Sequence, residues 1–106
     1  MLKKISKVSE ITPEELANYI RVDNYDPNEF ETYLNIAKNY ISNYTGIPTT
    51  SEKEGAETLD SYADFVIVVY ILCQDMYDNR AMYVDSSNIN KVVQTILDMH
   101  TRNNLW

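Results

Sequence analysis

The fold is decided by a long apolar stretch in the middle of the chain, residues 59–79, which read LDSYADFVIVVYILCQDMYDN. Residues 65–71 are rich in β-branched side chains and, taken alone, could form a strand. The apolar positions of the whole stretch nevertheless recur at helical spacing for about four turns, with no glycine or proline to interrupt them. The stretch therefore predicts one helix from about residue 59 to residue 79. Its middle is apolar on nearly every side, which is typical of a helix that is central in a bundle or that faces a second chain.

Two further helices are predicted before this stretch. Thr12 and Asp26 are each followed by a proline and then by a glutamate at the third helical position, which is the pattern of a capped helix N-terminus. The first helix is expected to end at about residue 19 or 20. The second is expected to end near Tyr44, because Gly46 suits the left-handed conformation that closes a helix.

The rest of the chain contains a last helix and two segments without a regular pattern. The last helix is expected to begin near residue 87 or 88 and to pack through Ile89, Val92/Val93, Ile96/Leu97 and His100. Residues 47–58 are polar and predict a variable loop, and residues 1–10 are expected to form a flexible N-terminal segment. With 106 residues and no internal repeat, the sequence predicts one all-α domain over residues 1–106. The expected architecture is a small four-helix bundle with a long central apolar helix.

The charge balance and the cysteine content limit the class of protein. Nine Lys and Arg residues stand against 16 Asp and Glu, which gives a net charge of −7 and disfavours a large phosphate-binding surface. The only cysteine, Cys73, cannot form an intrachain disulfide. No signal-peptide pattern is visible, and the longest apolar run has nine residues, about half of what a bilayer requires. We therefore expect a soluble protein made in the cytoplasm, with no membrane association.

A search for chemistry finds no catalytic arrangement. His100 has no second histidine or cysteine at ligand spacing and is expected to be a helix-end cation or a half-buried surface group. Cys73 lies inside the apolar run and is expected to be a small buried side chain. The acidic pair Asp75 and Asp78 is expected to mark the solvated end of its helix. We predict no catalytic residue, no cofactor and no metal, and a protein that is not an enzyme.

The aromatic content leaves two interpretations open. Nine tyrosines are many for 106 residues, and most stand at helical spacing. They fit either the wet edge of a small helical core or a set of protein–protein contacts, where tyrosine is enriched. Trp106, which follows Leu105, either folds back on the bundle or inserts into a partner.

Five short motifs, taken in their order and spacing, suggest a family. They are ITPEEL at residues 11–16, YIRVD at 19–23, NIAKNYI at 35–41, YTG at 44–46 and YDNR at 77–80. In these motifs the chain resembles the small all-α head–tail connector proteins, also called adaptor or DNA-packaging proteins, of long-tailed phages and prophages. The resemblance extends over nearly the whole chain.

The resemblance implies a structural protein of the virion. Such proteins form a ring of about twelve subunits beneath the portal vertex, through an interface of two different surfaces that repeats until it closes. The ring extends the DNA channel and joins the capsid to tail components. The expected partners are other copies of the chain, the portal protein and head-completion or tail proteins, while DNA passes through without specific binding. Residues 8–106 carry 6 basic and 16 acidic groups, a charge of −10 that suits such a channel.

The candidate interface residues come from the same reasoning. Those assigned to a subunit or partner interface are Arg21, Tyr70, Tyr77, Arg80, Leu105 and Trp106. Arg80 either caps its own helix or bridges to Asp23 or Asp85 within the chain, or it reaches the neighbouring subunit. Arg21 has the same two interpretations.

A helix-turn-helix DNA-binding regulator is the alternative. Residues 12–22 read like the first helix of that motif. The recognition helix would then begin with Asp26, Glu29 and Glu31. These three acids would lie where the helix should contact phosphates and bases, which argues against this alternative. The glycine expected in the turn is also missing.

Overall fold

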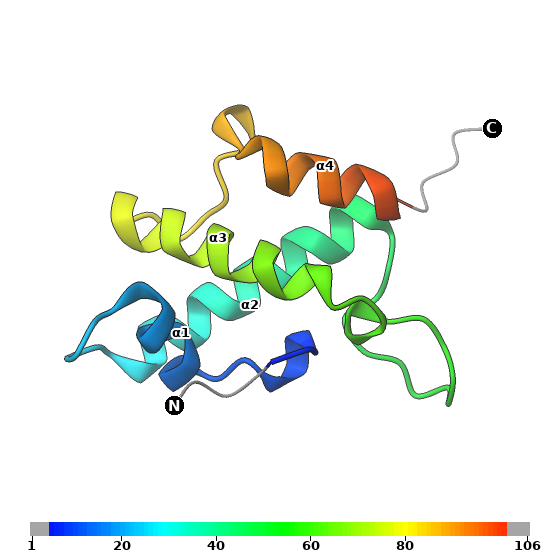
Figure 1. The fold of residues 1–106 in the computed structure, drawn as a ribbon, viewed down its shortest axis with the longest axis horizontal. Helices are drawn as coiled ribbons and strands as arrows, with labels where there is room; N and C mark the ends of the chain where they lie inside the picture. Colours follow the sequence, from blue (N-terminus) through cyan, green and yellow to red (C-terminus); the bar gives the residue numbers. More distant parts are fainter. Residues whose placement is uncertain (1–4, 102–106) are drawn as a thin grey trace.

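Four α-helices make up most of the computed structural model, which describes residues 5–101 (Figure 1). The helices are α1 (Pro13–Ile20), α2 (Pro27–Thr45), α3 (Asp64–Asn79) and α4 (Lys91–His100). Three short 3-10 turns accompany them, η1 (Val8–Glu10), η2 (Leu59–Ser61) and η3 (Ser86–Asn88). The described part of the chain contains no strand, so the all-α prediction is confirmed.

The helices α2 and α3 form the centre of the molecule. They pack against each other, and both α1 and α4 contact each of them. Figure 1 shows α1 and α4 on opposite sides of this pair. It also shows α3 and α4 running in opposite directions, so that the end of α4 lies beside the start of α3. No helix among residues 5–101 is long and apolar enough to cross a membrane.

The first two helices begin and end where local sequence signals predict. The Thr12 side chain accepts a hydrogen bond from the Glu15 amide at 3.2 Å, and the Asp26 side chain accepts one from the Asn28 amide at 2.9 Å. Gly46 closes α2 in the left-handed conformation, with φ at 81°. Each cap satisfies backbone groups that a helix end leaves without partners.

The start of α3 differs from the prediction. Thr58 and Ser61 form a separate turn, in which the Thr58 amide donates to Ser61 Oγ at 3.1 Å and the Ser61 amide donates to the Thr58 carbonyl at 2.9 Å. The backbone is then extended at Tyr62, and α3 begins only at Asp64. With 16 residues, α3 is shorter than predicted, and α2 with 19 residues is the longest helix.

The start of α4 also lies later than predicted. Asp85 holds the turn η3 by accepting hydrogen bonds from the Ser87 hydroxyl at 2.7 Å and the Asn88 amide group at 3.0 Å. Asn90 then caps α4, because its side chain accepts from the Val92 amide at 2.7 Å. A short polar side chain bonded to nearby backbone competes with a helix, and the helix therefore starts after Asn90.

The described part of the N-terminal segment is packed rather than loose. Val8 and Ile11 are buried in the core, and the Ser9 amide donates to Asp60 Oδ1 at 2.8 Å. Residues 8–10 were expected to belong to a flexible segment, and the structure instead places them against η2 and α3. The apolar side chain of Val8 explains this, since its burial stabilises the turn.

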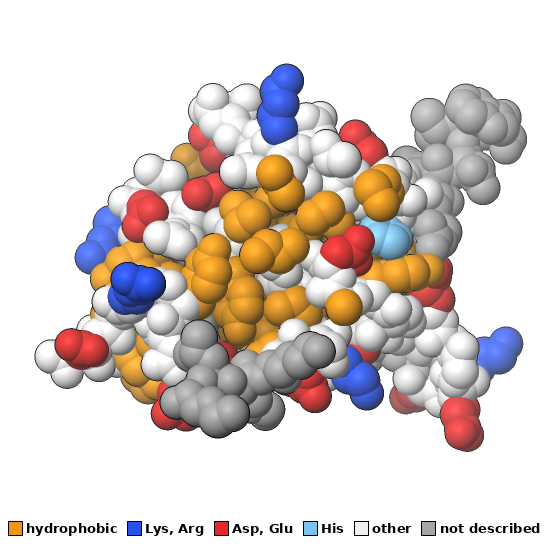
Figure 2. All heavy atoms as spheres, in the orientation of Figure 1, with side chains coloured by type: hydrophobic (Ala, Val, Ile, Leu, Met, Phe, Trp, Pro, Cys, Tyr) orange, Lys and Arg blue, Asp and Glu red, His pale blue; other side chains and the backbone are white. Residues whose placement is uncertain are grey.

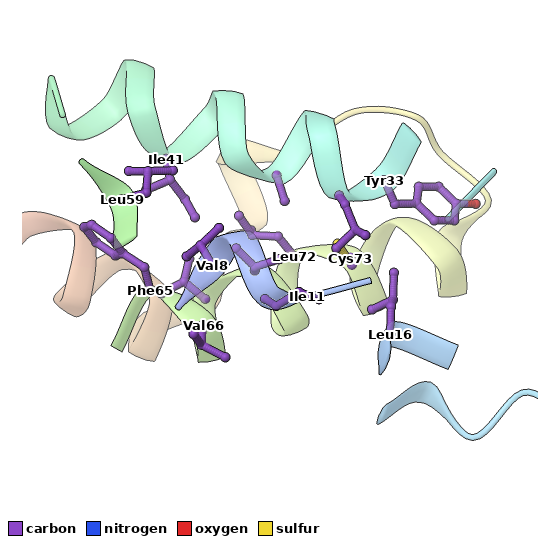
Figure 3. Packing of buried hydrophobic residues seen from close by; sticks show 14 of the residues in the cluster. Val8, Ile11, Leu16, Tyr33, Ile41, Leu59, Phe65, Val66, Leu72 and Cys73 are labelled. Carbon is purple, nitrogen blue, oxygen red and sulfur yellow. The ribbon is translucent and has the colours of Figure 1, made fainter. Parts of the chain in front are cut away.

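The core gathers apolar side chains from the four α-helices and from the turns η1 and η2 (Figure 3). In that view Leu16 of α1 and Ile41 of α2 point toward the side of α3 that carries Phe65 and Leu72. Cys73 is fully buried, as predicted, and burial raises the pKa of its thiol to about 12. The thiol is therefore protonated at neutral pH and packs as an apolar group.

Several tyrosines join the core to its acidic surroundings. The Tyr33 hydroxyl donates to Glu29 Oε2 at 2.6 Å, and the Tyr44 hydroxyl donates to Asp98 Oδ1 at 2.6 Å. Burial and the hydrogen bond to Glu29 raise the pKa of Tyr33 to about 12. Each ring is thus packed while its hydroxyl meets a carboxylate, which is the usual arrangement of a partly buried tyrosine.

Candidate interface surfaces

Arg80 and Tyr77 lie together at the end of α3. Arg80 is the residue that closes the helix, in the left-handed conformation with φ at 53°. Its guanidinium carbon lies 4.5 Å from the centre of the Tyr77 ring, and Nη1 lies 3.8 Å from Glu29 Oε2. The Tyr77 ring in turn meets Phe30 edge-on, with centroids 5.6 Å apart. The end of α3 is therefore fastened to the start of α2.

The Arg80 side chain remains open to a further partner. Its intrachain contact is with Glu29, not with Asp23 or Asp85 as the sequence suggested. The Arg80 side chain is 67% exposed and Glu29 is half-buried, and an ion pair as long as 3.8 Å with one exposed partner contributes little to stability. A guanidinium has five N–H donors, and the one ion pair that the described residues offer Arg80 uses Nη1.

Arg21 occupies the matching position at the end of α1. It is left-handed with φ at 68°, and its amide donates to the Ala17 carbonyl at 2.8 Å. Its side chain is exposed and makes no ion pair with any residue in 5–101. The structure thus presents a second arginine at a helix end. Leu105 and Trp106 lie outside the described residues.

Tyr70 lies in the middle of α3, where it stacks on Tyr19 of α1. The ring centroids are 4.6 Å apart and the planes differ by 11°. Burial raises the pKa of Tyr70, and the nearby Glu15 carboxylate adds to that effect. The stack connects α1 to α3, and Tyr19 keeps an exposed edge.

Apolar side chains remain uncovered beside this stack. Figure 2 shows hydrophobic side chains gathered in a band over α3 and along α4. On α3 the exposed member is Ile67, at 42%, followed one turn later by the half-buried Ile71. We call Ile67 and Ile71 the α3 stripe. Residues 5–101 cover these two side chains only in part.

A second stripe runs along α4. Val92 is 56% exposed and Met99 is 67% exposed, with the half-buried Ile96 between them. We call these three residues the α4 stripe. The sequence analysis counted Val92 with Val93 as one inward position, but only Val93 is buried. The sequence does contain a signal for this exposure. Consecutive residues point about 100° apart on a helix, so two adjacent valines cannot both face inward.

A third apolar feature is the loop that follows α3. Met82 and Tyr83 are exposed there, Tyr83 at 64%, and we call them the 82–83 loop. Neither was singled out from the sequence. Exposed single apolar residues are ordinary, but two adjacent ones at the tip of a loop form a projecting apolar group.

A groove of about 430 Å³ lies between this loop and α3. Its acidic members are Asp75 and Asp85, whose pKa values shift in opposite directions. Burial, and then the charge of Asp78, raises the pKa of Asp75. Hydrogen bonds from Asn88 and Ser87 lower the pKa of Asp85. Asp85 thus holds a turn through its carboxylate, whereas Asp75 faces the groove from α3.

The sequence analysis also missed the setting of His100. Its Nε2 lies 2.9 Å from Asp64 Oδ2, and its ring packs against Tyr62 and Phe65 with centroids 4.2 and 4.9 Å apart. The side chain is 15% exposed, so it is a half-buried group that fastens the end of α4 to the start of α3. Asp64 is 36 residues away in sequence, and no local pattern joins the two positions.

Within residues 5–101 no three His, Cys, Asp or Glu side chains are grouped so that they could hold a metal ion. What the described surface offers is three apolar features and two displayed arginines. Comparisons of the chain with protein-family models, with curated proteins and with solved structures found no match.

Proposed function

We propose that this chain is a structural subunit of a phage or prophage head–tail connector. In this proposal, copies of it form a ring at the portal vertex of the capsid, extend the DNA channel and join the head to tail components. The portal protein and head-completion or tail proteins are the partners, and the virion is the site of action. The basis is the resemblance carried by the five sequence motifs, together with the surface of the molecule.

The observation that supports a ring most directly is the presence of two separate apolar features of different shape. A ring contact is heterologous, because one surface of each copy meets a different surface of the next. The α3 stripe is a shallow apolar strip, and the 82–83 loop is a projecting apolar group. We assign the α3 stripe and the 82–83 loop as the two sides of the subunit contact.

Arg80 fits the edge of such a contact. It lies two residues before Met82, and its guanidinium is mostly exposed. A subunit joined through the 82–83 loop would therefore bring Arg80 toward carboxylates of its neighbour. Charged groups at the edge of an interface set the register of the contact more than its affinity.

The charge of the chain suits a channel for DNA. An acidic protein has few groups that bind phosphates, so packaged DNA could move past it without being held. The exposed residues of α2 include Asn35, Asn39 and Asn43, which are polar and uncharged. A surface of that kind neither attracts the DNA backbone strongly nor adds to its repulsion.

The proposal is tested by mixing the protein with the purified portal oligomer encoded beside it. We expect a complex that sediments faster than the portal alone and that shows an added ring in electron micrographs. Tyr83→Glu and Ile67→Glu should each prevent it, because each places a charge in one side of the contact. Thr32→Glu, an exposed change on α2, is the matched control and should leave the complex intact.

Two results would overturn the proposal. The first is a protein that does not bind portal and forms no assembly larger than a dimer at high concentration. The second is a complex that tolerates both Tyr83→Glu and Ile67→Glu, since the assigned surfaces would then be irrelevant. The helix-turn-helix regulator stays an untested alternative, and the acids at the start of α2 weigh against it.

A further inference from the structure

The groove between α3 and the segment that follows it is built on the last two turns of the helix. Its α3 side consists of residues three or four positions apart, which therefore share one side of the helix. They are Leu72, Asp75, Met76 and Asn79. The opposite wall is formed by the segment 81–89, which lies beside α3 before α4 begins. The volume of about 430 Å³ is within the range of about 300 to 1,000 Å³ that is usual for ligand-binding pockets.

The floor of the groove is apolar. Leu72 and Met76 are each 2% exposed, so the groove ends at the hydrophobic core of the molecule. Val84 and Ile89 are half-buried and add apolar surface from the opposite wall. The aliphatic part of a long side chain fits such a floor, whereas a small and strongly hydrated ion does not.

The charged side chains that line the groove are acidic on both walls. Asp75 lies on the α3 wall and Asp85 on the opposite one, and no Lys, Arg or His among residues 5–101 lines the groove. Neither carboxylate belongs to an ion pair within the described part of the chain. Burial and the charge of Asp78 raise the pKa of Asp75, so its negative charge lies in unfavourable surroundings. A positive charge brought into the groove would stabilise that carboxylate.

Arg80 does not neutralise the groove, although it follows the last lining residue of α3. Its guanidinium lies over the Tyr77 ring and 3.8 Å from Glu29, and it is not among the residues that line the groove. The negative charge of the walls is therefore not balanced by any cation of residues 5–101 within the groove.

One edge of the groove is aromatic. Tyr83 lines the groove and is 64% exposed. The face of an aromatic ring attracts a cation, and a planar guanidinium can also stack on it. A guanidinium in addition presents paired N–H donors to a carboxylate. An apolar floor, an aromatic edge and acidic walls are therefore together complementary to an arginine side chain, which has an aliphatic stem and a planar cationic head.

We propose that this groove is a docking site for an arginine side chain of a partner protein, carried on a segment with an apolar residue on either side of it. The apolar neighbours are expected because the exposed Met82 extends the surface of Tyr83 beyond the groove, where a small free cation would leave it uncovered. The inference goes beyond the proposed ring, because the chemistry of the segment defines the partner. Its test uses the isolated protein without portal.

The first experiment titrates isotope-labelled protein at low salt with a peptide blocked at both ends, Ala-Leu-Arg-Leu-Ala, and follows the backbone amide signals by NMR. We expect shifts in the last two turns of α3 and in residues 81–89, with a Kd of about 1 mM for so short a segment. The same peptide with citrulline in place of arginine keeps the shape without the charge and should bind roughly fivefold more weakly. Spermidine, a free polyamine, should also bind more weakly than the arginine peptide.

The second experiment changes the walls of the groove one side chain at a time. Asp75→Asn removes a charge at nearly constant size and should weaken peptide binding roughly fivefold. Glu52→Gln is the matched control, because it removes one charge from an exposed position in the loop 47–58, and it should leave the affinity unchanged. Tyr83→Ala should weaken binding about threefold and Tyr83→Phe should preserve it, because the ring face and not the hydroxyl meets the cation. All three positions are exposed, so thermal unfolding should be the same in every variant.

The inference is overturned if the arginine peptide leaves the amides of the groove unshifted, or if the citrulline peptide binds as tightly. Equal weakening by Asp75→Asn and Glu52→Gln would also contradict it, because the peptide would then be attracted by the net charge of the protein alone. Spermidine that binds as tightly as the peptide would assign the groove to free polyamines and not to a partner protein. None of these outcomes decides whether the chain binds portal, so the two proposals fail separately.

Discussion

The helices α2 and α4 have similar inner sides and different outer sides. Both pack on α3, α2 through residues such as Ile41 and α4 through Leu97, and both of these side chains are fully buried. The outer side of α2 is polar, whereas the outer side of α4 carries Val92 and Met99. Burial within the chain explains the inner sides equally well. Among the described residues, the two outer sides therefore differ in exposed apolar area, which is larger on α4.

The largest effect is expected from a substitution in the core that α2 and α4 share. Val69 of α3 is fully buried in the core on which both helices pack. Val69→Asp places an unpaired charge there, and we expect a loss of about 5 kcal/mol, enough to unfold a chain of this size. Circular dichroism should show the helical signal gone at 25 °C.

The matched control lies on the same helix. Ile67→Asp changes an exposed position and should keep the helical signal. If the two variants were equally folded, α3 would not be the shared centre of the molecule.

The difference between the two sides of α4 is measured with a pair of alanine substitutions. Leu97→Ala removes a fully buried side chain and should lower the free energy of unfolding by about 2 to 4 kcal/mol. Val92→Ala removes an exposed one and should change it by less than about 0.5 kcal/mol. Urea denaturation of dilute, monomeric protein gives both values. Equal losses would mean that the outer side of α4 is packed within the chain.

The contribution of Tyr33 on α2 to folding can be measured from the pH dependence of stability. The pKa of its hydroxyl is raised to about 12 in the folded protein, against about 10 in an unfolded chain. The unfolded chain therefore loses this proton first as pH rises, and folding stability should fall between about pH 10 and pH 12.

Tyr33→Phe should make folding stability fall less steeply over that pH range. At pH 7 the substitution should cost about 1.5 kcal/mol, because the hydrogen bond to the Glu29 carboxylate is lost. Urea midpoints at pH 7, 9 and 11 give both effects, and the buried Cys73 thiol contributes a decline of the same sign in both proteins. A decline that is identical in the variant would show that Tyr33 does not carry it.

The smallest expected effect on stability is that of Arg80→Ala. The contact with Glu29 is long and the Arg80 side chain is mostly exposed, so the free energy of unfolding should change by less than about 0.5 kcal/mol. Binding to portal should weaken, because the side chain lies beside the proposed ring contact. Thermal unfolding measures the first effect and sedimentation the second. A variant that unfolds would instead assign Arg80 to holding α3 against α2.

Local signals in the sequence were enough for the helices that have them. Thr12, Asp26 and Gly46 act on backbone groups within a few residues, and the boundaries that they predict are correct. The starts of α3 and α4 were placed too early, because Ser61 and Asp85 draw nearby amides into separate turns. Whether such a turn or the helix forms depends on the path of the chain in the folded protein, and the periodicity of apolar residues carries no information about that path.

The candidate surfaces were predictable only in part. Tyr77 and Arg80 are three residues apart on one helix, and the sequence analysis named both. The partner of Arg80 is Glu29, which is 51 residues away along the chain, and only the packing of α3 on α2 brings it close. The exposed Val92 was missed because it was counted together with Val93 as an inward position, and Met99 was not singled out.

Arg21 and Arg80 are the two residues other than glycine that have a positive φ angle among residues 5–101. A side chain in that conformation costs about 1 kcal/mol relative to glycine. The two positions at which glycine would relieve backbone strain are thus the two that carry an exposed arginine at a helix end. Glycine at both positions would therefore raise the free energy of unfolding and remove two exposed positive charges. The natural sequence instead keeps both arginines at a cost in stability.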